Sequence, residues 1–397
     1  MKHKICIIGL GYVGLPIAVA AAESGNIVYG YDTNLSKVSS LELGISYIED
    51  VDERTLKELL NKKSLIISTE PKDISELDTL LICVPTPLSS EREPDLSALL
   101  KATKLAGEML RSGMLVIVES TVEPGTVTNV VLPLLVKTSG LASTEFFVSF
   151  SPERIDPGNK VWNLKNTTKL VSGINRISTQ RAIQFYQSFV NNLFECSTIE
   201  VAETAKLLEN TFRLINISFI NELSIFCDMQ KIPIGEVIAA ARTKPYGFMP
   251  FYPSIGVGGH CIPVDPIYLS SAARKVGSPT RFIDLANQVN QEMPMRFVNR
   301  AIEKIGNLNG KKILVIGIAY KANVADVRES QVASLISELR VKGAMVKWHD
   351  DLVKEWNNEK SVTLSSDFDL AIIATPHDYL DLSVLKNVLI LDTRGSI

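Results

Sequence analysis

The sequence lacks the features that mark a disulfide-stabilised, zinc-binding or membrane-spanning protein. Its five cysteines are odd in number, far apart and without any Cys-x-x-Cys pair, which argues against a disulfide framework and against a structural metal site. No stretch approaches the roughly 20 uninterrupted apolar residues of a membrane helix. Neither charge dominates, because 41 basic residues nearly balance 44 acidic ones, so we expect no nucleic acid and no membrane as partner. These absences favour a soluble protein of the reducing cytoplasm.

What is present indicates a multidomain globular chain. A length of 397 residues is too great for one hydrophobic core and suggests two or three domains. The composition, 46% hydrophobic and 21% charged, is that of an ordinary globular protein.

A glycine motif near the N-terminus predicts a dinucleotide site. The apolar run 5–8 is typical of a buried parallel strand and leads directly into Gly9, Gly11 and Gly14, after which 15–24 has a helical pattern. The first glycine permits a tight turn, the second lets backbone N–H groups approach a pyrophosphate, and the third allows close packing of helix on strand. Alone, the motif is also compatible with an ordinary turn of an α/β protein.

The next strand, 27–31, strengthens the motif because it ends at Asp32, near the distance at which a carboxylate binds the ribose hydroxyls. That carboxylate would repel a 2′-phosphate, and Thr33 and Asn34 follow without an arginine. We therefore expect NAD rather than NADP.

Strands and helices then alternate. Apolar strands at 79–84, 115–119 and 146–149 are separated by helical segments such as 95–111, which predicts a doubly wound parallel sheet. Ligands of such sheets bind beyond the carboxyl ends of the strands. Two interpretations of these ends stay open: the polar side chains there face a ligand, or the adjacent prolines are simple strand terminators. The polar residues are Thr86, Thr121 and Glu153.

The middle of the chain predicts one long helix. Residues 200–229 contain no glycine or proline and carry apolar side chains at helical spacing. Lys206 and Asn210 lie four apart on one face, where a cation and an amide can both donate to one oxyanion, unless they are only solvated surface. A second helix is expected over 280–305.

Between these two helices lies an unusual loop around Cys261. Gly258 and Gly259 precede it, Pro263 follows, and Asp265 adds a carboxylate four residues on. Two interpretations remain open from the residues alone: a nucleophile in a shaped loop, or a small buried hydrophobe in a turn.

A second α/β pattern follows, with strands near 312–317, 345–348, 369–375 and 388–392 and a helix over 330–342. No Gly-x-Gly-x-x-Gly follows its first strand. Cations instead lie at or beyond strand ends, where together they make a second anion site plausible; they are Lys321, Arg328 and Arg394.

Seven motifs occur in an order that resembles the UDP-glucose/GDP-mannose dehydrogenase family over nearly the whole chain. They are 9–16 (GLGYVGLP), 84–87 (VPTP), 119–122 (ESTV), 151–154 (SPER), 205–210 (AKLLEN), the Cys261 loop, and 317–321 (GIAYK) leading to 326–330 (DVRES). The resemblance implies an α/β fold in which two Rossmann-like, doubly wound parallel-sheet domains are joined by a central helical region with one long helix. The expected domains are 1–198 for NAD, 199–305 with the Cys261 loop, and 306–397 for the UDP-sugar.

The resemblance also implies a reaction and roles. A sugar C6 alcohol is oxidised to a carboxylate with two NAD molecules, through a thiohemiacetal and a thioester on Cys261. The implied catalytic residues are Cys261, Lys206, Asn210, Asp265, Glu153 and Thr121. The implied cofactor-binding residues are Gly9, Gly11, Tyr12, Val13, Gly14, Asp32, Lys37, Thr86, Thr121 and Arg328. The implied substrate-binding residues are Glu153, Arg154, Lys206, Asn210, Phe251, Tyr252, Gly258 and Lys321.

The stretch 243–253 and the dipeptide His260-Cys261 look like the branch that acts on UDP-N-acetylhexosamines. The chain departs from the family at Pro157, where glucose-type members carry a second glutamate, at Val264, where they often have lysine, and at 50–51 and 254–255. We expect UDP-N-acetylglucosamine ahead of UDP-N-acetylmannosamine and UDP-glucose, and a uronate for surface polysaccharide as product.

Two other classes of function stay open. One is an inactive sensor that binds NAD or a nucleotide sugar, and the other is a single-step dehydrogenase of the 3-hydroxyacid type. The resemblance also implies a homodimer or higher homo-oligomer built on the long helix, unless the apolar face of that helix is fully used within one chain.

Overall fold

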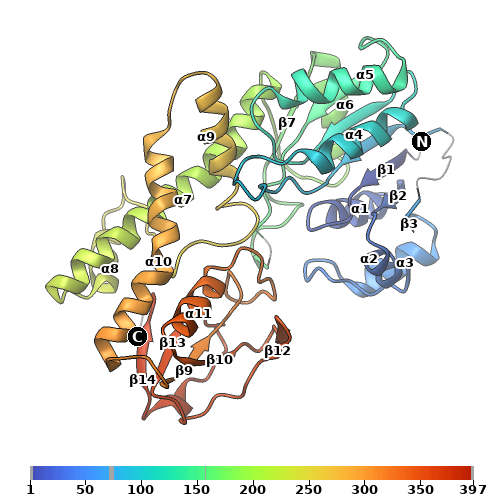
Figure 1. Ribbon diagram of the computed structural model, residues 1–397. Coiled ribbons are helices and arrows are strands. Elements are labelled where there is room, and N and C mark those ends of the chain that lie inside the picture. The colour runs from blue at the N-terminus through green and yellow to red at the C-terminus, as the bar shows by residue number, and fades with distance from the viewer. Residues whose placement is uncertain (1–2, 71–75, 157, 395–397) are drawn as a thin grey trace. The chain divides into compact units, whose positions relative to one another are not determined.

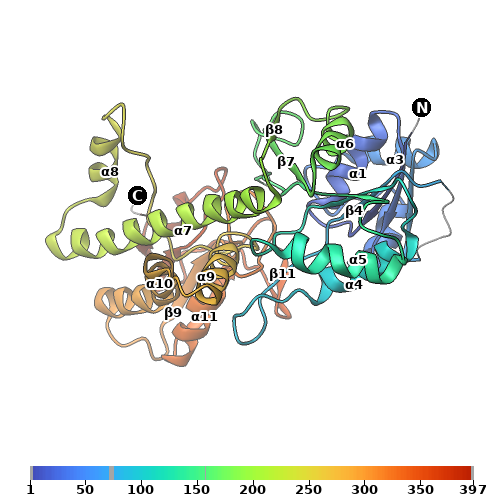
Figure 2. The same cartoon turned by 90° about the horizontal axis from the view of Figure 1, so that it is seen from above.

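The computed structural model describes residues 3–70, 76–156 and 158–394, and it divides into two compact units, residues 1–208 and 209–397 (Figures 1 and 2). Each unit is built around its own sheet. Pro157, one of the departures noted above, lies outside the described residues.

In the described part of the first unit, eight strands form one sheet in the order β3-β2-β1-β4-β5-β6-β7-β8. Their bounds are β1 (Lys4–Ile8), β2 (Ile27–Tyr31), β3 (Leu65–Ser68), β4 (Thr79–Ile82), β5 (Leu115–Val118), β6 (Phe147–Phe150), β7 (Lys169–Gly173) and β8 (Leu193–Glu195). All neighbours pair in parallel except β6 and β7, which are antiparallel through Ser149–Gly173 and Phe150–Ser172. A parallel crossover normally carries a helix, and the described residues between β6 and β7 contain none.

Helices cover both faces of this sheet (Figure 2). One core packs beneath α1 (Gly14–Glu23), α2 (Leu35–Glu42), α3 (Glu53–Asn61) and α6 (Arg176–Tyr186). The opposite core packs beneath α4 (Ser97–Met109) and α5 (Leu132–Ser139), which follows a π-helical turn, Val127–Val131. The central strands β1, β4 and β5 are almost fully buried because helices lie on both of their faces.

The predicted long helix is present as α7 (Ile199–Gln230), which begins in the first unit and continues into the second. It packs on α8 (Ile234–Arg242) through a small apolar cluster that includes Ile220 and Ile238. The second predicted helix is α10 (Arg281–Ile305), which accommodates Pro294 in its interior.

The second unit contains a four-stranded parallel sheet among its described residues, in the order β10-β9-β13-β14. The strands are β9 (Lys312–Ile316), β10 (Met345–His349), β13 (Leu370–Ile373) and β14 (Leu389–Asp392), with α11 (Gln331–Val341) between β9 and β10. Side chains of α10 and α11 fill one face of the sheet. A short hairpin, β11 (Glu355–Trp356) and β12 (Glu359–Lys360), and a 3-10 turn, Ser383–Leu385, complete the unit. Within the described ranges, no helix is long and apolar enough to span a membrane.

Candidate active site

The glycine motif forms a tight turn between β1 and α1. Gly9 has φ +98°, and a Cβ atom on it would lie 2.6 Å from the carbonyl oxygen of Cys83. A Cβ on Gly14 would lie 1.9 Å from the Gly9 oxygen, so neither position accepts a side chain. Around Gly11, nothing lies within 4 Å of the place a Cβ would occupy.

The start of α1 is also open, because no side chain caps it at Val13. The dipole of the helix favours a diphosphate at this end. The residues present therefore fit a dinucleotide, which Gly11, Tyr12, Val13 and the α1 N-terminus would hold.

Asp32 organises the same turn from the end of β2. Its Oδ2 accepts the N–H of Leu10 at 2.9 Å and its Oδ1 accepts the N–H of Asn34 at 2.9 Å. Tyr47, which was not singled out from the sequence, donates its hydroxyl to the Leu10 carbonyl, and Lys37 lies 5.3 Å from the centre of the Tyr47 ring. Through Tyr47 and Leu10, Lys37 is thus placed near the part of the turn that Asp32 contacts.

The loops after β4 and β5 are joined to each other. Thr86 Oγ1 donates to the carbonyl oxygen of Thr121 at 2.8 Å, and Ser120 Oγ donates to the Val84 carbonyl at 2.7 Å. Because β4 and β5 are neighbours, the two predicted threonines lie together at the carboxyl edge of the sheet, where ligands of such sheets bind.

The Glu153 carboxylate is held in place by the backbone N–H groups of the next two residues and by a buried lysine. Oε1 accepts the N–H groups of Arg154 at 2.6 Å and Ile155 at 2.7 Å, and Oε2 lies 3.3 Å from Nζ of Lys169. Lys169 is 3% exposed and also binds Glu119. Arg154 donates through Nη1 to the Thr168 carbonyl at 2.6 Å.

In the second unit, Asn210 and Asp265 meet. Asn210 Nδ2 donates to Asp265 Oδ2 at 2.6 Å, and the Asp265 side chain is buried. Asp265 begins α9 (Asp265–Lys275), where a carboxylate in the first turn is favoured by the helix dipole. Lys206, one turn earlier on α7, is also buried. The approach of Lys206 to Cys261 stays a prediction.

The Cys261 side chain is exposed, whereas the other four cysteines are buried. Its carbonyl oxygen accepts the N–H groups of Val264 at 3.1 Å and Asp265 at 2.8 Å, so the chain turns sharply after the thiol. The loop needs its glycines because a Cβ on Gly258 would lie 2.6 Å from the Glu329 oxygen and one on Gly259 would lie 2.8 Å from the Tyr320 ring.

The Cys261 loop is thereby tied to the motif 317–330. Gly259 N–H donates to the carbonyl oxygen of Arg328 at 3.1 Å. The guanidinium of Arg328 is bonded to Asp326, with Nε at 2.8 and 3.0 Å from the two carboxylate oxygens. Phe251 packs edge-on against Phe212 of α7 at 5.8 Å, and Tyr252 beside it is half exposed.

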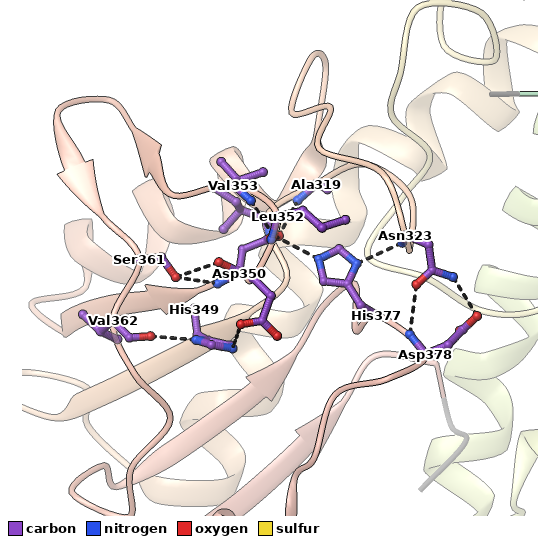
Figure 3. A network of polar contacts seen from close by, with 12 residues as sticks. Ala319, Asn323, His349, Asp350, Leu352, Val353, Ser361, Val362, His377 and Asp378 are labelled. Carbon is purple, nitrogen blue, oxygen red and sulfur yellow. Dashed lines mark hydrogen bonds and ion pairs between the residues drawn. The ribbon is translucent and has the colours of Figure 1, made fainter. Parts of the chain in front are cut away.

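In the second sheet (Figure 3), as in the first, a carboxylate that follows one strand accepts a backbone N–H group from the turn after the neighbouring strand. Asp350, after β10, accepts the N–H groups of Ile318 at 2.9 Å and Ala319 at 3.4 Å in the turn that follows β9. Its other oxygen accepts from Leu352, Val353 and His377. Asp350 is 1% exposed, so these bonds leave it no room for a ribose, in contrast to Asp32.

His377 donates a hydrogen bond to Asp350 in this network. His377 Nδ1 accepts the Asn323 N–H at 2.9 Å, which leaves the proton on Nε2, 3.0 Å from Asp350 Oδ1. Burial alone would raise the pKa of Asp350, but the bonds from His377 and from backbone N–H groups outweigh it and lower that pKa to about 2. The network fixes the loop that carries Lys321.

Sequence patterns did not reveal Tyr47, Lys169 or His377, although one signal was present for Lys169. A lysine that opens a strand and is followed by two aliphatic residues is expected to be buried, and a buried lysine requires an acidic partner. The described residues contain no group of three His, Cys, Asp or Glu side chains arranged to hold a metal ion.

Comparison with known proteins places the whole chain in one family. Residues 3–190 match the NAD binding domain of the UDP-glucose/GDP-mannose dehydrogenase family, 200–292 its central domain, and 314–397 its UDP binding domain.

Individual relatives cover most of the chain. It is 35% identical over 388 residues to UDP-N-acetyl-D-glucosamine 6-dehydrogenase of Salmonella typhi, covering 94% of this chain and 90% of that protein. It is 33% identical over 381 residues to UDP-N-acetyl-D-mannosamine dehydrogenase of Pyrococcus horikoshii, covering 94% and 89%. A solved structure of UDP-D-ManNAc dehydrogenase from Pyrococcus horikoshii matches with a TM-score of 0.90 at 32% identity, over 99% of this chain and 96% of that one. The chain therefore belongs to the UDP-glucose/GDP-mannose dehydrogenase family and is an NAD-dependent UDP-sugar dehydrogenase.

Proposed function

We propose that the protein oxidises the C6 alcohol of a UDP-N-acetylhexosamine to the uronate, with UDP-N-acetylglucosamine as the favoured substrate and Cys261 as the nucleophile. The observation that carries the proposal is the arrangement at the start of α9. An exposed thiol there precedes, by four residues, a buried carboxylate that accepts a 2.6 Å hydrogen bond from Asn210. A protein that only binds nucleotide sugars has no use for such a thiol.

Bound NAD accepts a hydride in each of the two oxidations. In the first, C6 loses a hydride and the O6 proton passes to solvent water, which gives an aldehyde. The Cys261 sulfur then forms a bond to C6. An unperturbed thiol of pKa about 8.5 is only about 3% ionised at pH 7, so the site must favour the thiolate or remove the proton during attack. Lys206, Asn210 and Thr121 are the donors assigned to the developing oxyanion.

The second hydride leaves C6 of the thiohemiacetal and produces a thioester. Water then adds to the acyl carbon, the carbon–sulfur bond breaks, and its electron pair leaves with the Cys261 sulfur. Asp265 positions the water and Glu153 accepts its proton. The second-glutamate position of glucose-type members is Pro157 here, so Glu153 carries this role alone.

The family branch follows from relatives named for both N-acetylhexosamines, at 35% and 33% identity. Two departures expected to influence the sugar, Ile255 and Val264, are buried. Ser254 donates its N–H to Asn221 of α7 at 2.8 Å. We assign their effect to the shape of the loop rather than to direct contact with the sugar.

We assign NAD to the domain of the first sheet and the UDP-sugar to the domain of the second sheet. The proposed domains are 1–198 for NAD, 199–305 with the Cys261 loop, and 306–397 for the UDP-sugar. Gly9, Gly11, Gly14, Asp32 and Lys37 hold the cofactor. Thr86 and Thr121 line its inner end. Arg328 reaches the cofactor, and Arg154, Phe251, Tyr252, Gly258 and Lys321 bind the substrate.

We also propose that the enzyme is a cytoplasmic homodimer or higher homo-oligomer that supplies a uronate for surface polysaccharide. Phe212, Phe219 and Phe226 recur every seven residues on α7 and are 45%, 59% and 55% exposed. Such spacing places them on one face of a helix, as in helix pairs that associate.

Counting NADH tests the function. Purified protein is incubated with NAD and, separately, with UDP-N-acetylglucosamine, UDP-N-acetylmannosamine and UDP-glucose, and NADH and uronate are measured against the sugar consumed. Two NADH per sugar with equimolar uronate supports the proposal. One NADH indicates a simple alcohol dehydrogenase, and no NADH with any of the three contradicts an active enzyme. The sugar with the highest kcat/KM identifies the substrate.

A further inference from the structure

Glu153, the proposed base of the hydrolytic step, is connected to a buried cluster of charges. Lys169, at the start of β7, lies with Nζ 2.7 Å from Glu119 Oε2, 3.3 Å from Glu153 Oε2 and 3.3 Å from the carbonyl oxygen of Pro152. An ammonium group has three donors, and all three are used. The side chains of Lys169, Glu119 and Glu153 are 4%, 0% and 12% exposed.

The hydrogen bonds of Glu153 decide which of its two carboxylate oxygens can accept a proton from water. Oε1 already accepts two backbone N–H groups, from Arg154 and Ile155, and so has no lone pair left for water. Oε2 accepts a single hydrogen bond, from Lys169, which leaves one lone pair. The oxygen that can take a proton is therefore the one that Lys169 contacts.

Glu119 and Tyr186, on the side of the cluster away from Glu153, hold Lys169 in place. Glu119 lies just beyond β5 and accepts the hydroxyl hydrogen of Tyr186, at the end of α6, while the Lys169 ammonium lies 5.1 Å from the centre of the Tyr186 ring. Burial disfavours the ammonium, yet attraction to Glu119 and Glu153 outweighs it and raises the pKa of Lys169. Lys169 therefore stays a cation throughout the working range.

The remaining titratable neighbours are few. Burial raises the pKa of Glu119 to about 7, against the opposing effect of Lys169. Burial, followed by the charge of Glu119, raises the pKa of the Cys83 thiol, which therefore stays neutral. Cys83 is also the residue against which Gly9 and Gly14 pack, so the cluster lies directly beneath the dinucleotide turn.

We propose that Lys169 is a positioning residue for thioester hydrolysis: it holds Glu153 with Oε2 directed to the attacking water, and Glu119 and Tyr186 hold Lys169 in place. The inference rests on the proposed function. In the step concerned, the oxygen of water bonds to the acyl carbon, its proton passes to Glu153 Oε2, and the carbon–sulfur bond breaks with its electrons on the Cys261 sulfur. Lys169 exchanges no proton and does not touch the substrate.

A purely structural role makes a different prediction. Breaking a buried ion pair costs stability and would lower NAD binding, hydride transfer and hydrolysis together. A positioning role instead predicts slower hydrolysis with NAD binding and hydride transfer unchanged, because only hydrolysis needs a base at Glu153.

The test compares Lys169→Met with the wild type and with Lys165→Met, a matched removal of an exposed lysine that pairs with Glu23. Enzyme is mixed with NAD and the UDP-sugar, and NADH is followed in the first turnover. Quenched samples are weighed by intact-protein mass spectrometry for the acyl adduct on Cys261, and its decay is measured from pH 5 to 9.

For Lys169→Met we expect a normal burst of two NADH per subunit, an accumulating acyl adduct, and hydrolysis slowed by about 10- to 100-fold at pH 7. Lys165→Met should behave as wild type. Unchanged adduct decay in Lys169→Met overturns the inference, and so does an equal loss in every step.

Glu119→Gln decides the matter if Lys169→Met does not fold, since an amide can bond both Lys169 and Tyr186. In the wild type, ionisation of Glu119, whose pKa is about 7, strengthens the ion pair that holds Lys169 in place against Glu153, so hydrolysis should rise a second time near pH 7. Glu119→Gln should lack that rise, and its retention would contradict the inference. A wild type that forms no uronate would instead contradict the proposed function itself.

Discussion

The side-chain amide of Asn210 donates a hydrogen bond of 2.6 Å to the carboxylate of Asp265, 55 residues further along the chain. The bond joins α7 to the first turn of α9, immediately after the Cys261 loop. It fixes the direction of the carboxylate that the proposed mechanism uses to position water.

Replacing Asn210 by leucine should therefore damage both stability and reaction. Loss of a hydrogen bond to a buried carboxylate costs about 1.5–3 kcal/mol of unfolding free energy, and uronate formation should fall by at least about 10-fold. Asn216→Leu is the matched control, because the hydrogen bond that Asn216 donates among the described residues goes to the Phe212 carbonyl on its own helix. Urea unfolding and product assays check the pair, and equal effects of both substitutions would contradict the role of the Asn210–Asp265 bond.

Cys261→Ser should abolish uronate formation and leave NAD binding intact. A hydroxyl is a far poorer nucleophile than a thiolate at neutral pH, and Cys261 is an exposed side chain whose loss opens no cavity. Product analysis with NAD titration by fluorescence checks this outcome. Cys227→Ser, at a buried cysteine of α7, controls for a general effect of the substitution, and wild-type rates in Cys261→Ser would remove the thioester from the mechanism.

Asp350 should stabilise the second unit in a pH-dependent way. Its pKa falls from 3.8 unfolded to about 2 folded, because the bonds from His377 and backbone N–H groups outweigh burial. A folded-state pKa below the unfolded value stabilises the protein above pH 3.8, by about 2 kcal/mol, and that contribution is lost as the pH falls through 2. Asp350→Asn should remove it at pH 7 and flatten the stability profile between pH 4 and 2.

Fluorescence of buried Trp348 in the same unit reports this unfolding. Asp351→Asn is the control, because Asp351 is 39% exposed and contacts only His349 at 3.5 Å among the ion pairs described. If the two asparagine variants lose the same stability at pH 7, the network around Asp350 is not its source.

Local patterns were sufficient to predict much of the framework. The absence of glycine and proline over 200–229 predicted α7, found at Ile199–Gln230, and the motif at Gly9 predicted the turn that Asp32 braces. Both depend on residues close in sequence or on a fixed spacing along the chain, which is why a single sequence reveals them.

Other features depend on contacts that no local pattern records. The reversed direction of β7 follows from a connection that lacks a helix, whereas the strand itself, Lys169–Gly173, would suit either direction. Lys169 meets Glu119 and Tyr186 only after β5, β7 and α6 have packed. Asp265 was predicted in a loop, and the structure shows that it begins α9 because Pro266 occupies the first turn.

Asp32 should make the enzyme strongly prefer NAD. Its carboxylate braces the turn, and in the proposed cofactor site it would accept the ribose hydroxyls, so that a 2′-phosphate there would meet a negative charge. Asp32→Asn should lower kcat/KM for NAD by about 10- to 100-fold while raising the NADP to NAD ratio. Asp52→Asn, at the exposed N-cap of α3, controls for loss of a helix-capping carboxylate. Equal use of both cofactors by the wild type would contradict this assignment.

Substitution on the exposed face of α7 should dissociate the proposed homo-oligomer. Phe219 and Phe226 are seven residues apart and more than half exposed, so a charge at either place would have to be buried between two copies, at a cost of several kcal/mol. Phe226→Glu should therefore elute as a monomer in size exclusion with light scattering, where the wild type elutes as a dimer or larger. Phe282→Glu is the matched control, because Phe282 is 78% exposed on α10 and should leave the mass unchanged. A monomeric wild type, or an unchanged mass of Phe226→Glu, would show that the phenylalanines of α7 do not join two copies of the chain.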